Sequence, residues 1–310
     1  MKTKLFILSL FLFLLTVSTS ASVKLSKDAT ISILTCSPGN ELYSLFGHTG
    51  IRVVDKANNM DIVFNYGTFD FDTQGFYFKF ARGLLPYQLS CSEFRRFLSS
   101  YIYDKRSVYS QTLNLDSIQK QYLMDLLIEN YQPANREYLY NFLYDNCSTR
   151  VRDIIEKSTG NQITWIAQPS TKSFWNLLDE YLGRSPWIQW GIHTILGSPA
   201  TSTATLREQM FLPDYLMYHL DSAAYNGTPL VQPIETVYEA PEQDLSTPWY
   251  FSPFFVFAIC TLALVSLLQK IKSRRLLKAI AIPFFVVTGI VGCLIVFLCF
   301  FTKHPTMFPN

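Results

Sequence analysis

The chain has 310 residues, of which 49% are hydrophobic and only 16% are charged. Soluble domains carry about 25% charged residues, so this composition, with a positive mean hydropathy of +0.13, indicates that part of the chain lies in lipid. The 26 basic and 24 acidic residues leave a net charge of +2, which excludes a nucleic-acid binder held by a broad basic face. The abundance of apolar residues also excludes a disordered chain.

The first residues are typical of a secretory signal peptide. Two lysines precede an apolar stretch over residues 5–15, and small residues follow up to Ala21. We expect cleavage near Ala21, which makes residues 1–21 a signal peptide and exports residues 22–245. An uncleaved N-terminal anchor is the alternative, and it would export the same domain.

Two uncharged apolar stretches, residues 251–268 and 279–302, lie near the C-terminus. Each has about 20 residues, enough to cross a bilayer as a helix. The connecting segment 269–278 carries five lysines and arginines, and basic loops stay on the cytoplasmic side of a membrane. The sequence therefore predicts a transmembrane hairpin with its loop in the cytoplasm, and with the domain 22–245 and the tail 303–310 on the exported side of the membrane.

The exported part mixes strands and helices. Strands are expected at residues 31–35, 48–54 and 61–66, the last two forming a hairpin, because β-branched residues alternate there between turn residues. One helix is expected after the capping residue Asp116, and another from Cys147 to Lys157. Their apolar stripes are Leu123, Leu126 and Leu127 in the first helix, and Val151, Ile154 and Ile155 in the second. Strands that precede and mix with helices predict an α+β domain.

Cys147 is the candidate nucleophile. It follows Asp145 and Asn146, residue types that cap helices, so its thiol is expected at a helix N-terminus. There the free N–H groups and the helix dipole favour a thiolate, and the N–H groups can form half of an oxyanion hole. The alternative is a structural cysteine buried on the same stripe as Val151.

His48 is the candidate general base for this thiol. It begins a β-branched strand and has glycines on both sides, which allow another backbone or a substrate to approach closely. The third residue, which would orient the imidazole, is expected to be Asn65 on the neighbouring strand, with Tyr66 and Asp70 as alternatives. No metal ion or organic cofactor is expected.

Other cysteines and the tryptophans carry weaker indications. Cys36 and Cys91 are exported with Cys147, and a disulfide between the first two is one interpretation of the odd count. The tryptophans between residues 165 and 190 are interpreted as aromatic core, or alternatively as a face against the membrane surface.

Several segments, taken in order, resemble the Lnb N-terminal periplasmic domain family over roughly residues 28–225. They are Cys36–Gly39, Phe46–Thr49, Phe64–Phe71, Lys79–Gly83, Asp145–Arg150 and Phe211–Tyr215. The order, with His48 before Cys147, is similar to circularly permuted papain-like folds of the NlpC/P60 and lecithin:retinol acyltransferase type. This resemblance implies a small antiparallel sheet packed on the helix that bears the nucleophile. It also implies that the hairpin crosses a bacterial inner membrane and that the domain 22–245 and the tail 303–310 lie in the periplasm.

The family is named after a lipoprotein N-acyltransferase. The resemblance implies an enzyme that moves an acyl chain from a phospholipid, through a Cys147 thioester, to the N-terminal amine of a diacylglyceryl-cysteine lipoprotein. The family layout also leads us to expect more membrane spans than the two predicted here. The candidate substrate-binding residues are Arg150, Arg52, Arg82 and Tyr66. Two alternatives are a cysteine peptidase or amidase acting on cell-wall peptides and a non-catalytic envelope scaffold.

Overall fold

The computed structural model describes residues 23–166, 171–242 and 247–303, so the expected signal peptide 1–21 and nearly all of the tail 303–310 lie outside the described residues. Within these ranges seven strands form one antiparallel sheet in the order β10-β5-β1-β2-β3-β4-β6. The strands are β1 (Thr30–Cys36), β2 (His48–Asp55), β3 (Met60–Thr68), β4 (Pro86–Glu93), β5 (Val108–Thr112), β6 (Glu137–Leu139) and β10 (Glu235–Tyr238).

The centre of the sheet is the β2–β3 hairpin, which confirms the hairpin predicted from the alternating residues. Its turn is a short 3-10 helix at Lys56–Asn58, closed by Asn59 in the left-handed conformation at φ 49°. Strand β1 pairs with β2 so that Cys36 lies opposite His48. On the other side β3 pairs with β4, and the register shifts between Asn65 and Thr68. The hairpin therefore carries His48 and Asn65 on adjacent strands.

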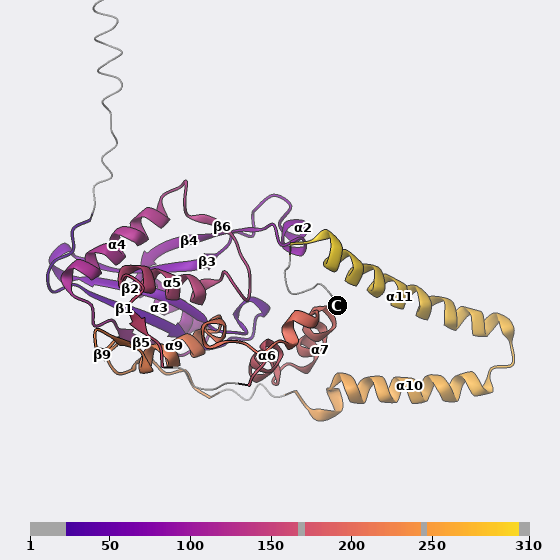
Figure 1. The fold of residues 1–310 in the computed structure, drawn as a ribbon. Coiled ribbons are helices and arrows are strands. Elements are labelled where there is room, and N and C mark those ends of the chain that lie inside the picture. The colour runs from indigo at the N-terminus through magenta and orange to yellow at the C-terminus, as the bar shows by residue number, and fades with distance from the viewer. Residues whose placement is uncertain (1–22, 167–170, 243–246, 304–310) are drawn as a thin grey trace, which may run out of the picture.

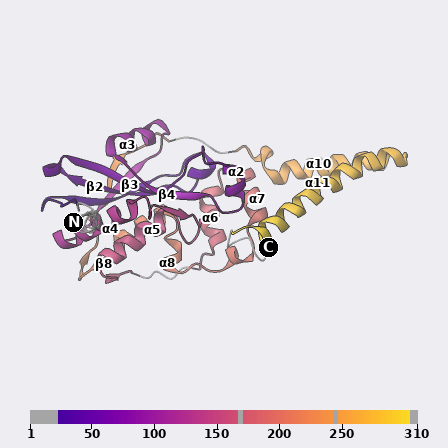
Figure 2. The same cartoon turned by 90° about the horizontal axis from the view of Figure 1, so that it is seen from above.

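Helices cover both faces of the sheet, as Figure 2 shows: α3 (Phe94–Tyr103) lies on one face, and α4 (Ser117–Tyr131) and α5 (Cys147–Ser158) lie on the other. Alternation along β1 decides which side chains enter which layer. Ile31 and Ile33 join the core beneath α4 and α5, whereas Leu34 and Cys36 join the core beneath α3. The fold is thus α+β, with an antiparallel sheet between helical layers.

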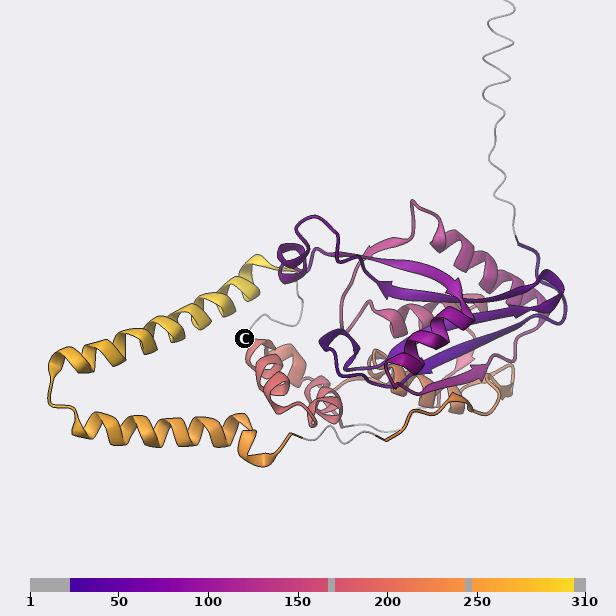
Figure 3. The same ribbon diagram turned by 180° about the vertical axis from the view of Figure 1, so that it is seen from behind.

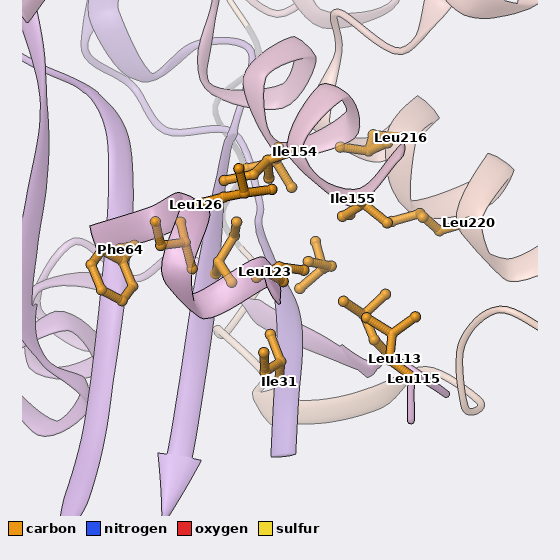
Figure 4. Close-up of a cluster of buried hydrophobic side chains, with 14 of the residues drawn as sticks. Ile31, Phe64, Leu113, Leu115, Leu123, Leu126, Ile154, Ile155, Leu216 and Leu220 are labelled. Carbon is orange, nitrogen blue, oxygen red and sulfur yellow. The ribbon is translucent and has the colours of Figure 1, made fainter. Parts of the chain in front are cut away.

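The larger core fills the layer between the sheet and α4 and α5 (Figure 4). Both predicted apolar stripes are buried there: Leu123, Leu126, Leu127, Val151, Ile154 and Ile155. Asp116 caps α4 with a capping box completed by Gln119, as the sequence predicts. Helix α5 ends at Ser158, and Gly160 follows at φ +63°, a conformation that favours glycine.

The rest of the domain packs around this centre. Helices α6 (Phe174–Leu182), α7 (Pro186–Ile195), α8 (Leu206–Gln209) and α9 (Pro213–Ser222) follow in chain order. A second core joins residues of α6 to Leu45, Leu143, Phe211 and Leu212. A three-stranded sheet of β7 (Ile163–Thr164), β8 (Ala224–Tyr225) and β9 (Thr228–Pro229) also belongs to this part. A short helix, α2 (Phe76–Ala81), lies between β3 and β4.

Two long apolar helices follow the domain, α10 (Pro253–Lys270) and α11 (Arg274–Phe301). They extend away from one end of it (Figure 1), and both are long and apolar enough to cross a membrane. Of the most apolar 18 residues of each helix, only 6% are buried inside the protein in α10 and none are buried in α11. The core helix of a soluble protein would be mostly buried. Helix α11 starts five residues before the predicted span 279–302, because its basic first turns continue the helix beyond the apolar stretch.

The interpretation that Cys36 and Cys91 form a disulfide is wrong. Both are free thiols. Cys36 lies on β1 and Cys91 on β4, with β2 and β3 between them. Neighbouring strands are about 4.8 Å apart, so three spacings separate the cysteines by roughly twice the Cα distance that a disulfide can bridge.

Candidate functional site

Cys147 is the first residue of α5, where the sequence predicts it. The preceding Asn146 is the N-cap: its side-chain oxygen accepts hydrogen bonds of 2.9 Å from both Ser148 N and Thr149 N. Thr149 Oγ1 accepts in return from Asn146 N at 2.8 Å, which completes a capping box. This start fixes the thiol at the positive end of the helix dipole, beside N–H groups that have no acceptor within the helix.

His48 and Asn65 meet at the β2–β3 hairpin. His48 Nε2 lies 3.3 Å from Asn65 Oδ1. An amide oxygen only accepts hydrogen bonds, so this contact places the proton of a neutral imidazole on Nε2. The other ring nitrogen, Nδ1, is then free to accept a proton from a thiol. Of the three residues proposed to orient His48, Asn65 is the one that contacts it.

The thiol of Cys147 lies among three polar partners. Burial alone would raise its pKa, but the charge of His48 and hydrogen bonds from His48, the Thr49 N–H and the Ser148 hydroxyl together hold the pKa below the ordinary value of 9.0. Ser148 is itself held by the hydroxyl of Thr49 at 2.8 Å. The residue is only 7% exposed, so these interactions act in a site with little water.

The other two thiols of the domain behave in the opposite way. Burial raises the pKa of Cys36 to about 12 and that of Cys91 to about 11. Cys36 lies opposite His48 in the sheet register, but its nearest charged group is Arg106. Proximity in the sheet is therefore not enough to activate a thiol, and Cys147 differs because an imidazole and two hydrogen-bond donors point at it.

Two glycines leave room for this arrangement. A Cβ on Gly50 would lie 3.1 Å from Asn65 Oδ1, so a side chain there would push on the residue that contacts His48. A Cβ on Gly67, which has φ +85°, would lie 3.6 Å from Cys147 Cβ and 3.5 Å from the Tyr140 ring. Both positions bring backbone close to the candidate site, as expected for glycine next to a reactive group.

Asn146 ties the start of α5 to the rest of the domain. Its side-chain nitrogen, Nδ2, donates to the carbonyl of Phe142 at 2.7 Å and to that of Phe211 at 2.8 Å. Phe211 opens the late segment Phe211–Tyr215, whose Pro213 lies against Gly47, beside His48. The last of the segments that suggested the family therefore supports both halves of the site.

Replacing Asn146 should lower the stability of the folded protein. The Asn146→Ala variant removes the helix cap and leaves two carbonyls without their donor, so we expect a loss of about 2–4 kcal/mol of unfolding free energy. Thermal unfolding of the full chain in detergent measures it. The matched control is Asp116→Ala, which removes the exposed cap of α4 and should cost about 1 kcal/mol. Equal losses in the two variants would contradict the special role of Asn146.

Of the remaining predicted site residues, two lie near Cys147 and three lie elsewhere in the domain. Arg150 and Tyr66 lie near the start of α5: Arg150 forms a two-pronged ion pair with Asp145 at 2.5 and 2.8 Å, and its guanidinium lies 5.9 Å from the Tyr66 ring. The Tyr66 hydroxyl accepts from Asn130 Nδ2 at 2.7 Å. Both side chains thus have protein partners already.

Arg52, Arg82 and Asp70 lie elsewhere. Arg52 pairs with Asp61 at 2.7 Å and stacks 3.4 Å from the centre of the Phe94 ring. Arg82 follows α2, and Asp70 accepts a hydrogen bond from the backbone of its own turn. Within the described residues, no hydrogen bond or ion pair joins any of the three to Cys147 or His48.

Sequence reasoning missed several neighbours of the thiol. Thr49 and Ser148 contact it, and each directly follows a predicted catalytic residue in the sequence. Tyr138 and Tyr140 line the site from β6 and the turn after it, and the Tyr138 hydroxyl is buried without a hydrogen-bond partner in the described residues. Only the alternation of tyrosines at 138 and 140 signals them, and this pattern is equally typical of an ordinary strand.

The tryptophans have two different surroundings. Trp165 donates to Glu156 at 3.0 Å beside the larger core, and Trp175 stacks on His193. Trp187 and Trp190 instead pack against Phe257 of α10. Trp165 thus fits the interpretation as core, and Trp187 and Trp190 are partly exposed beside α10, so the interpretation as a face against the membrane stays a prediction. No group of three His, Cys, Asp or Glu side chains that could hold a metal ion occurs in the described part of the chain.

Comparison with known proteins places the chain in a family. Residues 19–179, more than half of the chain, match the Lnb N-terminal periplasmic domain, and residues 243–310 match the Lnb transmembrane domain. No curated protein and no solved structure matches. The first matched region holds the candidate site and every strand of the large sheet except β10, and the second holds the two apolar helices. The chain therefore belongs to the Lnb family, as a membrane protein with a periplasmic domain.

Proposed function

We propose that the protein is an acyltransferase of the bacterial inner membrane that uses Cys147 as its nucleophile and His48, oriented by Asn65, as its base. The observation that carries this proposal is geometric: the Cys147 thiol lies at the N-terminus of α5 in contact with His48, and His48 contacts Asn65 in turn. The pKa of this thiol is lowered, whereas burial raises the pKa of the other two thiols of the domain. A buried thiol whose pKa is lowered by a specific imidazole is a functional-site candidate on physical grounds.

In the first half-reaction the Cys147 thiolate attacks the ester carbonyl carbon of a phospholipid acyl chain. The C–O bond of the ester breaks, and the departing lysophospholipid oxygen takes the proton that His48 holds. The acyl chain is then bound to Cys147 as a thioester. The negative charge that forms on the carbonyl oxygen is stabilised by the N–H of Cys147 and by the positive end of the α5 dipole, because the N–H groups of Ser148 and Thr149 already donate to Asn146.

In the second half-reaction the α-amine of a diacylglyceryl-cysteine lipoprotein attacks the thioester carbon. His48 accepts a proton from this amine, the C–S bond breaks, and the thiolate and protonated imidazole are restored. The products are a lysophospholipid and an N-acylated lipoprotein. Because Cys147 is nearly buried, water competes poorly with the amine for the thioester.

The membrane helices support a lipid substrate. Trp187 Nε1 donates to the carbonyl of Phe251 at 2.7 Å, just before α10, so the domain is held against its own membrane helix. A tether of this kind raises the effective concentration of substrates anchored in the same bilayer. A peptidase acting on cell-wall peptides would gain nothing comparable from it.

The test is to incubate the purified full-length protein with phospholipid and a synthetic diacylglyceryl-cysteine peptide. We expect the peptide to gain one acyl chain on its amine. We also expect the protein, incubated without peptide, to gain one acyl chain on Cys147 that neutral hydroxylamine removes. Cleavage of cell-wall peptides without either adduct would instead identify a peptidase, and no reaction with either substrate would favour a scaffold.

A further inference from the structure

Four aromatic side chains around α2 point into solvent. The exposed fractions are 65% for Phe71, 82% for Tyr77, 63% for Phe78 and 46% for Phe80. Single exposed apolar residues are normal on a protein surface, but a group of large rings within residues 71–80 is an apolar patch, and such patches mark interaction sites. The candidate catalytic site does not use these side chains.

The position of this patch relative to the membrane helices indicates its partner. Lys303 N, directly after α11, donates to the carbonyl of Arg82, directly after α2, at 3.0 Å. Figure 3 shows α2 beside the domain end of α11. The part of α11 after Lys278 is uncharged and apolar, and a helix of this length lies with its middle in the hydrocarbon and its ends at the two surfaces of the bilayer. The C-terminal end of α11 therefore holds α2 at the bilayer surface on the side of the domain.

A second contact, between α7 and α10, places the domain at the same membrane surface. Trp187 and Trp190 of α7 pack against Phe257, in the second turn of α10, with ring centres 5.6 and 5.2 Å away. Tryptophan is enriched at membrane–water interfaces because one end of its ring system is apolar and the other can donate a hydrogen bond. The domain thus meets the bilayer through α7 at one helix and through α2 at the other.

The charges around α2 fit a phospholipid surface. Lys79 and Arg82 are interleaved with the exposed rings, and the Arg82 guanidinium lies 5.5 Å from the centre of the Phe78 ring. Basic side chains at this depth reach the phosphate groups while their stems lie along apolar surface. The two acidic residues nearby, Asp70 and Asp72, lie in the turn before the helix.

A series of aromatic contacts connects the patch to the candidate site. Phe71 and Phe76 contact Phe69, whose ring lies 5.2 Å from Tyr87. Tyr87 stacks on Tyr140 at 4.4 Å, and Tyr140 lies against Gly67 beside Cys147. A chain of ring contacts therefore leads from the exposed rings to the residues beside the thiol.

We propose that residues 69–82, which we call the aromatic lip, insert into the headgroup region of the leaflet that faces the domain and bind phospholipid there. Phe71, Tyr77 and Phe78 enter the boundary with the acyl chains, and Lys79 and Arg82 bind the lipid phosphates. This insertion is independent of the reaction that the domain catalyses. A second consequence, that the aromatic lip guides an acyl chain toward Cys147, rests on the proposed acyl transfer.

Photolabelling of the intact protein tests the insertion. The full chain is reconstituted in vesicles of phosphatidylethanolamine and phosphatidylglycerol that contain a phospholipid with a diazirine on its acyl chain. After irradiation, labelled peptides are identified by mass spectrometry. We expect adducts on α10, on α11 and on the aromatic lip, and none at Ile118, which is 80% exposed in the first turn of α4. Adducts confined to α10 and α11 would overturn the proposal.

Charged substitutions in the aromatic lip provide a second test of the insertion. A variant with Tyr77→Glu and Phe78→Glu should lower the yield of lip adducts several-fold, because carboxylates are unfavourable in lipid. These side chains are exposed, so the fold should tolerate the change, and Ile118→Glu is the matched control that should leave all adducts unchanged. Lip adducts that persist at the original yield in the double variant would contradict insertion through these rings.

The same samples separate this inference from the proposed function. Labelling needs no catalysis, so a Cys147→Ser protein should show the same lip adducts as the unaltered chain. Adducts without any acyl transfer by the unaltered protein would contradict the acyltransferase and support the aromatic lip. Acyl transfer without lip adducts would contradict the aromatic lip alone.

Discussion

The Cys147→Ser variant is expected to lose acyl transfer by roughly 10⁴-fold or more, the scale found when a covalent nucleophile is removed. A serine hydroxyl fits the same place at the start of α5, but the contacts that lower the pKa of a thiol cannot ionise a hydroxyl near neutral pH. Transfer to a diacylglyceryl-cysteine peptide, measured by mass spectrometry, gives the rate, and the hydroxylamine-sensitive adduct should disappear.

Cys91→Ser is the matched control for this loss. Cys91 is the half-buried thiol on β4 whose pKa burial raises to about 11. Its replacement should leave the transfer rate within a few-fold of the unaltered protein. If both variants keep full activity, the thiol of Cys147 is not the nucleophile and the proposed mechanism fails.

The His48→Gln variant is expected to lose transfer by roughly 10²–10⁴-fold, as is typical for removal of a general base. It should also change the pH dependence of the thiol. In the unaltered protein the charge and hydrogen bond of His48 lower the pKa of Cys147 against the effect of burial. Without His48, burial dominates, and the pKa of Cys147 should rise above its ordinary value of 9.0.

Alkylation of the thiol by iodoacetamide measures this shift, because only the thiolate reacts readily. In the unaltered protein the rate should fall only when the pH drops below the lowered pKa. In His48→Gln the same fall should occur at higher pH. His219→Gln, in α9, is the control and should leave the profile unchanged. Identical profiles for the unaltered protein and His48→Gln would mean that the imidazole does not activate the thiol.

The parts of the fold that the sequence predicted are those set by local patterns. The β2–β3 hairpin needs only alternating residues and a turn, and α4 and α5 need only a cap and an apolar stripe. The edge strands β6 and β10 have three and four residues, too few for a clear alternation, and they form because longer strands lie beside them. Helix α2 has no buried residue and therefore no apolar stripe to reveal it.

The candidate site follows the same division. The start of a capped helix positions Cys147, and the start of a strand positions His48, so both were predictable from their neighbours in sequence. The choice between Asn65, Tyr66 and Asp70 was not, because it depends on the exact register of β3 and on the shift after Asn65. Arg52 looked equally able to bind a phosphate until its pairing with Asp61 and Phe94 was known.

The long separation along the chain between the base and the nucleophile has a consequence for export. His48 and Asn65 come from one hairpin, and Cys147 from a helix about eighty residues later that packs on it only through tertiary contacts. An unfolded chain crossing the membrane therefore carries an ordinary thiol with no imidazole beside it. The contacts that lower the pKa of Cys147 form only once the sheet has closed against α5, so the chain crosses the membrane without an activated thiol.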